Sequence, residues 1–506
     1  MYRRFKRSSG VVMPIFSFSS PYGIGTMGKE AYEFVDFLEK SGQHYWQVLP
    51  MGHTDGNNCP YQCYSIAAGN PLFIDLDNLV ERGLVEREFL EQYEIFFKDT
   101  HKVGFSAEKV KYSAVSEFHY HVLRKAYSDA SEEIKHQVEE FAQANTDWLK
   151  DYSLFMALMD KFNKPIWEWD PDIKMRDSDA LVWYSKILKK EIGFYQFVQY
   201  LFFLQWDELK SYANGKGIKI IGDIPFYPSP NSCDVWANPA IFLVNKDLVL
   251  TCSAGVPPDY FSETGQLWGN PVYNWNVLKE TGYRWWINRI QYTLRIVDVI
   301  RLDHFRAFQD YWVVPAGEKT AINGEWLPGP RMDFFETIKN CLGEVSFIAE
   351  DLGIIGDDVR ELLRQTGYPG MAVIIFGLRA REDNIHLPHN CKRNSVLYTG
   401  THDTETFCQA IEELEDEADR AFALEYIDAN SSNEPIGFRV IRTVFMSPAD
   451  LAMVMAADLL SLGKSGRINI PGTVGEFNWS WRISKGALNS ELAEKLRLIT
   501  ITYKRA

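Results

Sequence analysis

Short runs of β-branched and aromatic residues recur along the chain and predict eight buried strands. Nearly every position within a run is apolar, which is the pattern of parallel strands covered on both faces. Patterns typical of amphipathic helices lie between most of the runs, as in Lys29–Leu38 and Asp358–Thr366. This alternation favours the α/β class and a (β/α)8 TIM barrel over a doubly wound sheet, which shares the same local pattern. The predicted strands are Val11–Ile15, Tyr45–Leu49, Ile218–Ile221, Val297–Leu302, Val345–Ala349, Ala372–Phe376, Val396–Tyr398 and Ile468–Ile470.

Three long gaps between the predicted strands indicate how the barrel is enlarged. The first gap predicts a mostly helical insertion over residues 77–200, after the second strand, with helices such as Val80–Tyr93 and Asp179–Tyr200. The second, over residues 226–294, is rich in Pro, Gly, Asn and aromatic residues, which is typical of a folded loop that covers a site. The third, Thr404–Arg467, carries two or three predicted helices. We therefore expect residues 1–506 to form one catalytic barrel with large inserted subdomains on its carboxyl-terminal face.

Carboxylates follow four of the predicted strands. Because barrel enzymes keep their chemistry on the loops after the strands, we expect these side chains to converge at one end of the barrel. Asp303 and Glu350 come from adjacent strand ends, which can supply the ~5–5.5 Å that retaining glycoside chemistry needs between a nucleophilic and an acid/base carboxylate. Arg301 lies two residues before Asp303, hence on the same face, and keeps Asp303 ionised. The strand-end residues are Asp223; Arg301, Asp303 and His304; Glu350; and His402 and Asp403.

Aromatic residues make up 14% of the chain, and many fall in segments rich in Gly and Pro. Sugar rings stack their C–H faces on Trp and Tyr and leave their hydroxyls to polar side chains, so this mixture favours a sugar-binding cleft. The residues concerned are Tyr61, Gln62 and Asn70; Asp259, Tyr260, Phe261, Trp268 and Asn270; and Asn478, Trp479, Trp481 and Arg482. The net charge of −15 argues against nucleic acid or an anionic membrane as a partner, because both need a basic face.

The other motifs predict no membrane span, metal or cofactor. No apolar run approaches the ~18–20 residues of a membrane helix, and the N-terminus lacks the pattern of a signal peptide. Seven scattered cysteines are typical of reduced thiols and predict a cytoplasmic location. The segment Gly23–Gly28 matches G-x-G-x-x-G, but no strand leads directly into it, which argues against a nucleotide site. Cys59 with Cys63, and the segment His386–Cys391, lack a second pair of ligands and argue against zinc.

A set of sequence strings resembles one known family. The strings are SPYGIG, PYQCYS followed by GNPLF, GDIPFY, WGNP, RLDHFR, IAEDLG, GTHDTET and PGTVGEFNWSWR. In this order they are similar to the 4-α-glucanotransferases of glycoside hydrolase family 77, within the α-amylase superfamily, and they run from about residue 10 to residue 482. The chain departs from the family at Cys59 and Cys63, where Ser is more frequent, near Ala67, where Phe is, and in GEFNW, which has one residue more than usual.

The resemblance implies roles for individual residues. Asp303 would be the nucleophile, Glu350 the general acid/base and Asp403 the stabiliser of the transition state. Substrate binding would fall to Tyr61, Asp223, Arg301, His304, His402, Trp268, Asn270, Asn478 and Trp479, with Trp268 and the Pro257–Gly269 loop covering the acceptor side. Members of the family need neither a metal nor an organic cofactor for the chemistry.

The resemblance also implies a reaction. The chain would transfer a segment of an α-1,4-glucan, such as a maltooligosaccharide or amylose, to the 4-hydroxyl of glucose or of another glucan. The transfer would pass through a covalent glucosyl-enzyme and retain the configuration. A retaining α-glucan hydrolase of the same superfamily is the main alternative, and a non-catalytic glucan-binding barrel is the other. No separate starch-binding module is expected, and the sequence leaves open whether the protein is a monomer or a homodimer.

Overall fold

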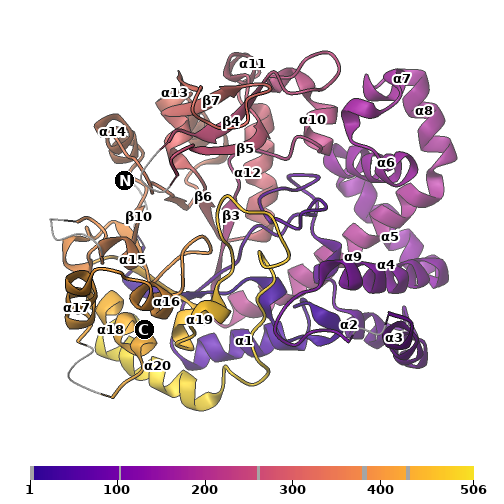
Figure 1. The fold of residues 1–506 in the computed structure, drawn as a ribbon. Coiled ribbons are helices and arrows are strands. Elements are labelled where there is room, and N and C mark those ends of the chain that lie inside the picture. The colour runs from indigo at the N-terminus through magenta and orange to yellow at the C-terminus, as the bar shows by residue number, and fades with distance from the viewer. Residues whose placement is uncertain (1–4, 102–103, 259–261, 379–383, 429–432) are drawn as a thin grey trace.

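Eight parallel strands form the centre of the molecule and confirm the TIM barrel (Figure 1). The computed structural model describes residues 5–101, 104–258, 262–378, 384–428 and 433–506. In barrel order the strands are β10 (Gly370–Val373), β11 (Ser395–Tyr398), β12 (Leu451–Met455), β1 (Ser8–Val12), β2 (Tyr45–Gln47), β3 (Lys219–Ile224), β6 (Val299–Leu302) and β9 (Phe347–Ala349). Between β9 and β10, the N–H of Ala349 donates to the carbonyl of Pro369 at 2.9 Å, which joins the two ends of the sheet.

The predicted eighth strand, Ile468–Ile470, is wrong. The strand that closes the barrel is β12, all of whose residues are buried, and it pairs with β1 on one side and β11 on the other. Its sequence, LAMVM, has one β-branched residue and runs on into helix α19 (Ala456–Leu459), so its composition favours a helix. Tertiary pairing overrides that propensity. Residues 468–470 have no regular structure, and Asn469 contacts Asp403, which follows strand β11.

Between β2 and β3 the chain is mostly helical. The helices are α2 (Leu76–Glu81), α3 (Arg87–His101), α4 (Tyr112–Asp129), α5 (Glu132–Ala144), α6 (Thr146–Phe162), α7 (Pro171–Lys174), α8 (Ser178–Ile187) and α9 (Lys189–Gly215). The helix predicted over Val80–Tyr93 is interrupted, because Gly83 has a φ of +70° and ends α2. The helix predicted over Asp179–Tyr200 is divided at Leu188 into α8 and α9. Figure 1 shows α4 to α8 beside the barrel.

Helix α9 anchors the segment that follows β2. The side-chain amide of Gln199 donates to the carbonyl of Gly69 and accepts from its N–H, both at 2.8 Å. One turn and a half further on, Gln205 accepts from the N–H of Asp75 at 2.7 Å and donates to its carbonyl at 3.1 Å. Both glutamines are buried, so these paired bonds satisfy groups that water does not reach. The segment from β2 to Asp75 is therefore held on the rigid helical insertion.

A second, antiparallel sheet lies near the carboxyl-terminal end of the barrel. Its strand order is β5 (Gln266–Pro271), β4 (Cys252–Val256), β7 (Asp310–Pro315) and β8 (Glu325–Pro328). Residues 226–294 thus contain two strands and the helices α10 (Cys233–Ala237), α11 (Trp275–Glu280) and α12 (Arg284–Ile296), in addition to loops. β4 pairs with β7, which comes after β6, so the insertion is tied to the segment that follows β6.

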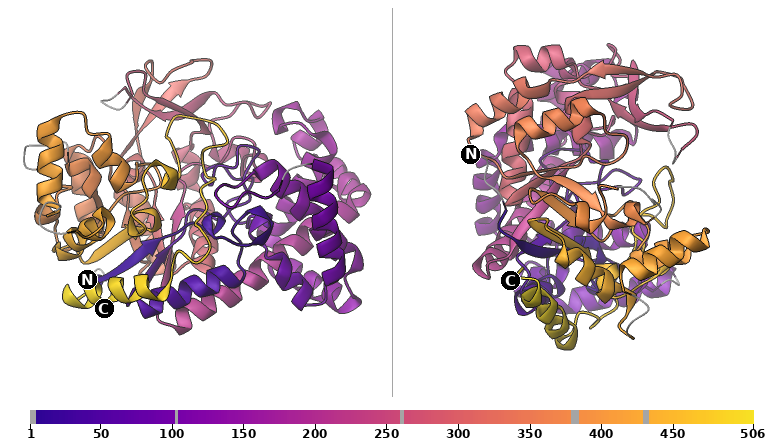
Figure 2. Two further views of the ribbon diagram at one scale, coloured as in Figure 1. Left: turned by 60° about the horizontal axis from the view of Figure 1, so that its bottom comes forward. Right: turned by 90° about the vertical axis from the view of Figure 1, so that its left-hand side faces the viewer.

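The remaining helices pack around the barrel. They are α1 (Lys29–Lys40), α13 (Arg331–Leu342), α14 (Asp357–Thr366), α15 (Ile374–Gly377), α16 (Phe407–Glu412), α17 (Glu417–Tyr426), α18 (Ile436–Met446) and α20 (Ser490–Thr502). Figure 2 shows α20 alongside α1, against which it packs. Across the described ranges, we find no helix that combines the length and the apolar character needed to cross a bilayer.

Candidate active site

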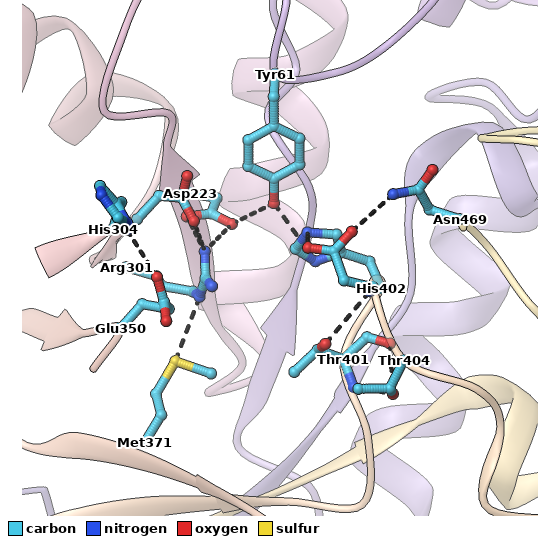
Figure 3. Close-up of polar contacts among 12 residues, drawn as sticks. Tyr61, Asp223, Arg301, His304, Glu350, Met371, Thr401, His402, Thr404 and Asn469 are labelled. Atoms are coloured by element: carbon cyan, nitrogen blue, oxygen red, sulfur yellow. Dashed lines mark hydrogen bonds and ion pairs between the residues drawn. The ribbon is translucent and has the colours of Figure 1, made fainter. Parts of the chain in front are cut away.

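Arg301 lies at the centre of a cluster of acidic side chains at the carboxyl-terminal end of the barrel (Figure 3). Its Nη1 donates to both carboxylate oxygens of Asp223, at 2.8 and 2.6 Å, and to Asp303 Oδ1 at 2.9 Å. Asp223 is on β3, and Asp303 follows β6 directly, so two neighbouring strands supply the pair. Arg301 and Asp303 share a face of the chain because they are two residues apart. The predicted contact between them is present.

The environment of Asp303 pulls its pKa in two directions. Burial raises the pKa and Asp223 adds to this effect, whereas Arg301 lowers it, and the result is a pKa of about 6. The carboxylate is thus harder to ionise than an exposed aspartate, yet is mostly ionised at neutral pH. About a quarter of the side chain (26%) remains exposed, so a substrate can reach it.

Glu350 follows β9 and is held by the backbone. The N–H groups of His304 and Leu352 donate to its two carboxylate oxygens, each at 2.8 Å. His304 points its N–H at Glu350 because its φ is +48°, a left-handed conformation that few residues other than Gly adopt. Burial raises the pKa of Glu350, Arg301 lowers it, and the charge of Asp303 raises it again. The result is a pKa of about 7. Two carboxyl groups of different acidity thus lie beside one arginine.

The pKa values of this pair predict a narrow pH optimum. Since Asp303 ionises as the pH rises through about 6 and Glu350 loses its proton through about 7, the productive state, with Asp303 charged and Glu350 protonated, is most populated between these values. We expect kcat/KM to rise up to pH 6 and to fall above pH 7, with initial rates on maltotriose as the measurement. A kcat/KM that is constant from pH 5 to 9 would contradict both assignments, that of the acid-side rise to Asp303 and that of the alkaline-side fall to Glu350.

Asp403 and His402 form a second polar group on the opposite side of the cluster. His402 Nε2 lies 3.1 Å from Asp403 Oδ2, and Asn469 Nδ2 donates to Asp403 Oδ1 at 2.7 Å. Partial desolvation alone would raise the pKa of Asp403, but His402 and the amide of Asn469 outweigh it and lower the pKa to about 2. The side chain of Asp403 is 48% exposed, so an ionised carboxylate that His402 and Asn469 orient remains accessible to solvent.

Tyr61 connects the two polar groups. Its hydroxyl donates to Asp223 Oδ2 at 2.6 Å and lies 3.4 Å from His402 Nδ1. The ring stacks on the imidazole of His402 at 5.0 Å between centroids, and Trp479 packs against both rings at 5.9 and 5.8 Å. These three rings form an aromatic wall beside the carboxylates. His402 and Trp479 are buried whereas Tyr61 is partly exposed, so Tyr61 is the ring of this wall that a sugar can reach.

The other predicted binding residues occupy different positions. Trp268, on β5, packs edge to face against His304 at 4.9 Å, so it borders the side of the cluster that holds Glu350. Asn270 is buried, exchanges hydrogen bonds with Gln62 and donates to the carbonyl of Pro228 at 2.8 Å. Asn478 uses its amide within its own loop, where it accepts from Ile470 N–H and donates to Thr473. These two amides hold loops in place. Asp259, Tyr260 and Phe261, which belong to the predicted covering loop, lie outside the described residues.

The structure adds residues to the cluster that the sequence analysis did not select. Asn469 holds Asp403, and Met371 on β10 accepts from Arg301 Nε at 3.3 Å. The contact of Asn469 with Asp403 is not predicted, because the apolar pattern of Ile468–Ile470 predicts a strand there. Met371 follows the pattern of a buried strand residue, and no sequence signal separates it from an ordinary core methionine. Among the described residues, no group of three or more His, Cys, Asp and Glu side chains is arranged to hold a metal ion.

Comparison with known proteins identifies the family. The profile of the family described as 4-alpha-glucanotransferase matches residues 13–489. The 4-alpha-glucanotransferase of Clostridium butyricum is 44% identical over 495 residues, which cover 97% of this chain and all of that protein. The chain belongs to the 4-α-glucanotransferase family. The resemblance stated from sequence strings is thereby confirmed, and so is its activity class, transfer between α-1,4-glucans rather than hydrolysis.

Solved structures agree with the family assignment. The amylomaltase from Streptococcus agalactiae, solved in complex with acarbose, is 40% identical and matches with a TM-score of 0.93 over 99% of this chain and all of that one. The amylomaltase of Corynebacterium glutamicum, at 20% identity, has a TM-score of 0.76 over 99% of this chain and 74% of that one, and supports the fold. The barrel and its inserted elements are thus shared with amylomaltases.

Proposed function

We propose that this 4-α-glucanotransferase works by double displacement, with Asp303 as nucleophile and Glu350 as general acid/base. The observation that carries the proposal is the unequal pair of carboxyl groups at Arg301. One has a pKa of about 6 and contacts the arginine at 2.9 Å, and the other has a pKa of about 7 and is held by two backbone N–H groups. A nucleophile has to be ionised and an acid protonated at the same pH, and the contacts differ in that sense: Arg301 donates to Asp303, whereas burial and the charge of Asp303 raise the pKa of Glu350.

In the first step, a carboxylate oxygen of Asp303 attacks the anomeric carbon of the donor glucan. The bond from that carbon to the leaving O4 breaks, and O4 takes the bonding electrons together with the proton of Glu350. The products are a glucosyl ester on Asp303 and a glucan that departs with a free 4-hydroxyl. As Asp303 gives up its charge to the new bond, Arg301 retains Asp223 as a partner and stays neutralised.

In the second step, Glu350 acts as a base. It removes the proton from the 4-hydroxyl of an incoming glucan while that oxygen attacks the anomeric carbon and displaces Asp303. The second inversion restores the α configuration. The positive charge that develops on the sugar ring in both steps lies near Asp403, whose pKa of about 2 keeps it ionised, and the 2- and 3-hydroxyls of that ring are its partners in this proposal.

The aromatic wall supports an uncharged sugar as the substrate. Tyr61, His402 and Trp479 pack on one another beside the cluster, and Trp268 borders it on the side of Glu350. We assign the wall to the donor sugar that reacts and Trp268 to the acceptor, and we propose maltooligosaccharides and amylose as donors and glucose or a glucan as acceptors. The acarbose bound to the amylomaltase of Streptococcus agalactiae, an oligosaccharide ligand, supports this substrate class. Glu350 donates a proton to the leaving oxygen in the first step and takes one from the acceptor in the second, so the proposed reaction requires no cofactor.

Maltotriose alone distinguishes transfer from hydrolysis. Transfer conserves the number of glycosidic bonds, so we expect glucose and longer maltooligosaccharides to appear while the concentration of reducing ends stays constant. Chromatography of the products with a parallel reducing-sugar assay measures both quantities. A steady increase in reducing ends, with a rate close to that of maltotriose consumption, would show that water is the main acceptor and would refute the proposed glucose and glucan acceptors.

A cytoplasmic location fits the thiols of the chain. All seven cysteines are free, and three of them, Cys233, Cys391 and Cys408, are buried. Reduced cysteines in a chain of this length are typical of a reducing compartment. We therefore propose that the enzyme acts on glucans in the cytoplasm.

A further inference from the structure

Arg301 makes one contact that the proposed mechanism does not use. Its Nε–H donates to the thioether sulfur of Met371 at 3.3 Å, on the side of the guanidinium that faces away from Asp223 (Figure 3). Both side chains are buried, with 4% of each exposed. A thioether is a weak but polarizable acceptor, and in a buried place it is the partner that this N–H group has in place of water.

The sulfur is held in position by the backbone of its own strand. Met371 is on β10, where it pairs with Val396 on β11. Its N–H donates to Asp351 Oδ1 at 2.7 Å, and Asp351 directly follows Glu350. Met371 therefore connects the turn that carries Glu350 to the guanidinium on β6. It does so across β9 and β10, where the two ends of the sheet meet.

The chemistry of the acceptor matters because of the charge nearby. Leucine at this position would fill a similar volume but leave the Nε–H unpaired, which buried donors avoid. A carboxylate would pair with the N–H but compete with Asp223 and Asp303 for the positive charge. The thioether accepts the hydrogen bond and adds no charge, so the full charge of Arg301 acts on the two aspartates.

We propose that Met371 is a positioning residue for the glucan transfer, because its sulfur orients the guanidinium of Arg301 so that Nη1 reaches Asp223 and Asp303 together. The inference rests on the proposed role of Asp303 as nucleophile. Met371 itself touches neither the sugar nor the reacting atoms. The titratable groups that face Arg301 are Asp223 on β3, Asp303 after β6, Glu350 after β9, Tyr61 after β2, Tyr398 on β11, and His402 and Asp403 after β11.

The test compares Met371→Leu with Met371→Gln, whose amide oxygen can accept the same hydrogen bond. A guanidinium that is free to turn attracts Asp303 less, so the carboxylate ionises at higher pH. For Met371→Leu we expect kcat on maltotriose to fall about 10-fold, KM to stay within about 2-fold, and the acid limb of kcat/KM to move up by about half a pH unit. Met371→Gln should restore the position of the limb and most of kcat. Met453→Leu, the same exchange at a fully buried methionine on β12, is the matched control and should change neither.

Two results would overturn the inference. One is a Met371→Leu enzyme with the wild-type kcat and acid limb. The other is an equal loss in the Leu and Gln variants with no movement of the acid limb, since that outcome indicates packing alone; thermal unfolding of each variant confirms that it is folded. If Asp303→Ala keeps its activity, the proposed function itself fails, whereas an inactive Asp303→Ala with a normal Met371→Leu refutes the role of Met371 only.

Discussion

Replacing Asp303 by Asn should lower kcat/KM for maltooligosaccharides by at least about 10⁴-fold, because an amide does not form the glucosyl ester. The protein should still fold. Arg301 keeps both oxygens of Asp223 as partners, and the side-chain volume is almost unchanged. Initial rates of glucose release from maltotriose measure the effect, and thermal unfolding shows that the variant is folded.

Asp310→Asn is the matched control for this experiment. Asp310 is also half-buried and also pairs with an arginine, since Arg306 Nε donates to it at 3.0 Å, but it belongs to β7 of the antiparallel sheet. It should leave the rate within about 3-fold of the wild type. Retention of more than about 1% of the activity in Asp303→Asn, with Asp310→Asn unaffected, would remove Asp303 from the role of nucleophile.

Replacing Glu350 by Gln slows transfer from maltotriose by about 10²–10⁴-fold, since the leaving oxygen no longer receives a proton. The loss should depend on the donor. Fluoride leaves without a proton, so the first step with α-maltosyl fluoride should proceed in the variant at a rate close to that of the wild type. The maltosyl ester then accumulates, because the amide that replaces the carboxylate is no base for the acceptor, and mass spectrometry of the quenched protein should detect a maltosyl group on Asp303.

Azide provides the complementary measurement for Glu350. It is an anion and needs no base, so it should restore turnover of α-maltosyl fluoride in Glu350→Gln and give an α-configured maltosyl azide. Glu361→Gln, at an exposed glutamate of α14 that pairs with Arg364, is the control for the same chemical change. An equal decrease of the rates with maltotriose and with the fluoride would show that Glu350 is not the proton donor.

Most of the fold could be predicted from the local pattern of apolar and polar residues. Seven of the eight predicted strands coincide with barrel strands to within a few residues, because buried parallel strands are continuous apolar runs that alternate with helices. The eighth was missed because β12 consists largely of Ala, Met and Leu, whose intrinsic preference is helical. Only its place between β1 and β11 makes it a strand, and a partner so far away along the chain leaves no trace in a local pattern. Strands β4 and β5 of the antiparallel sheet were missed for a different reason, because they lie in a segment whose Gly and Pro content indicates loops.

The acidic cluster was predictable because each of its members sits at a strand end beside a recognisable motif. Asp223, Arg301, Asp303, Glu350 and Asp403 all converge as expected, and their individual catalytic roles stay predictions until the variants are measured. What the sequence did not indicate are the side chains that act on these groups from irregular segments or from the core. Asn469 and Met371 are examples. Asn478 is the opposite case: the sequence predicts that it binds substrate, but its amide forms hydrogen bonds within its own loop.

The pairing of β1 with β12 has a consequence for how the chain is made. Ser8 lies opposite Leu451 in the barrel. During synthesis, the edge of β1 that pairs with β12 therefore has no partner until residues 451–455 have been made. At about 5–20 residues per second, this interval lasts roughly 20–90 seconds. During it, one edge of β1 has no partner strand and can pair with another chain, whereas in the finished barrel both of its edges are paired. We therefore expect the risk of aggregation through this edge to be greater during synthesis than in the folded enzyme.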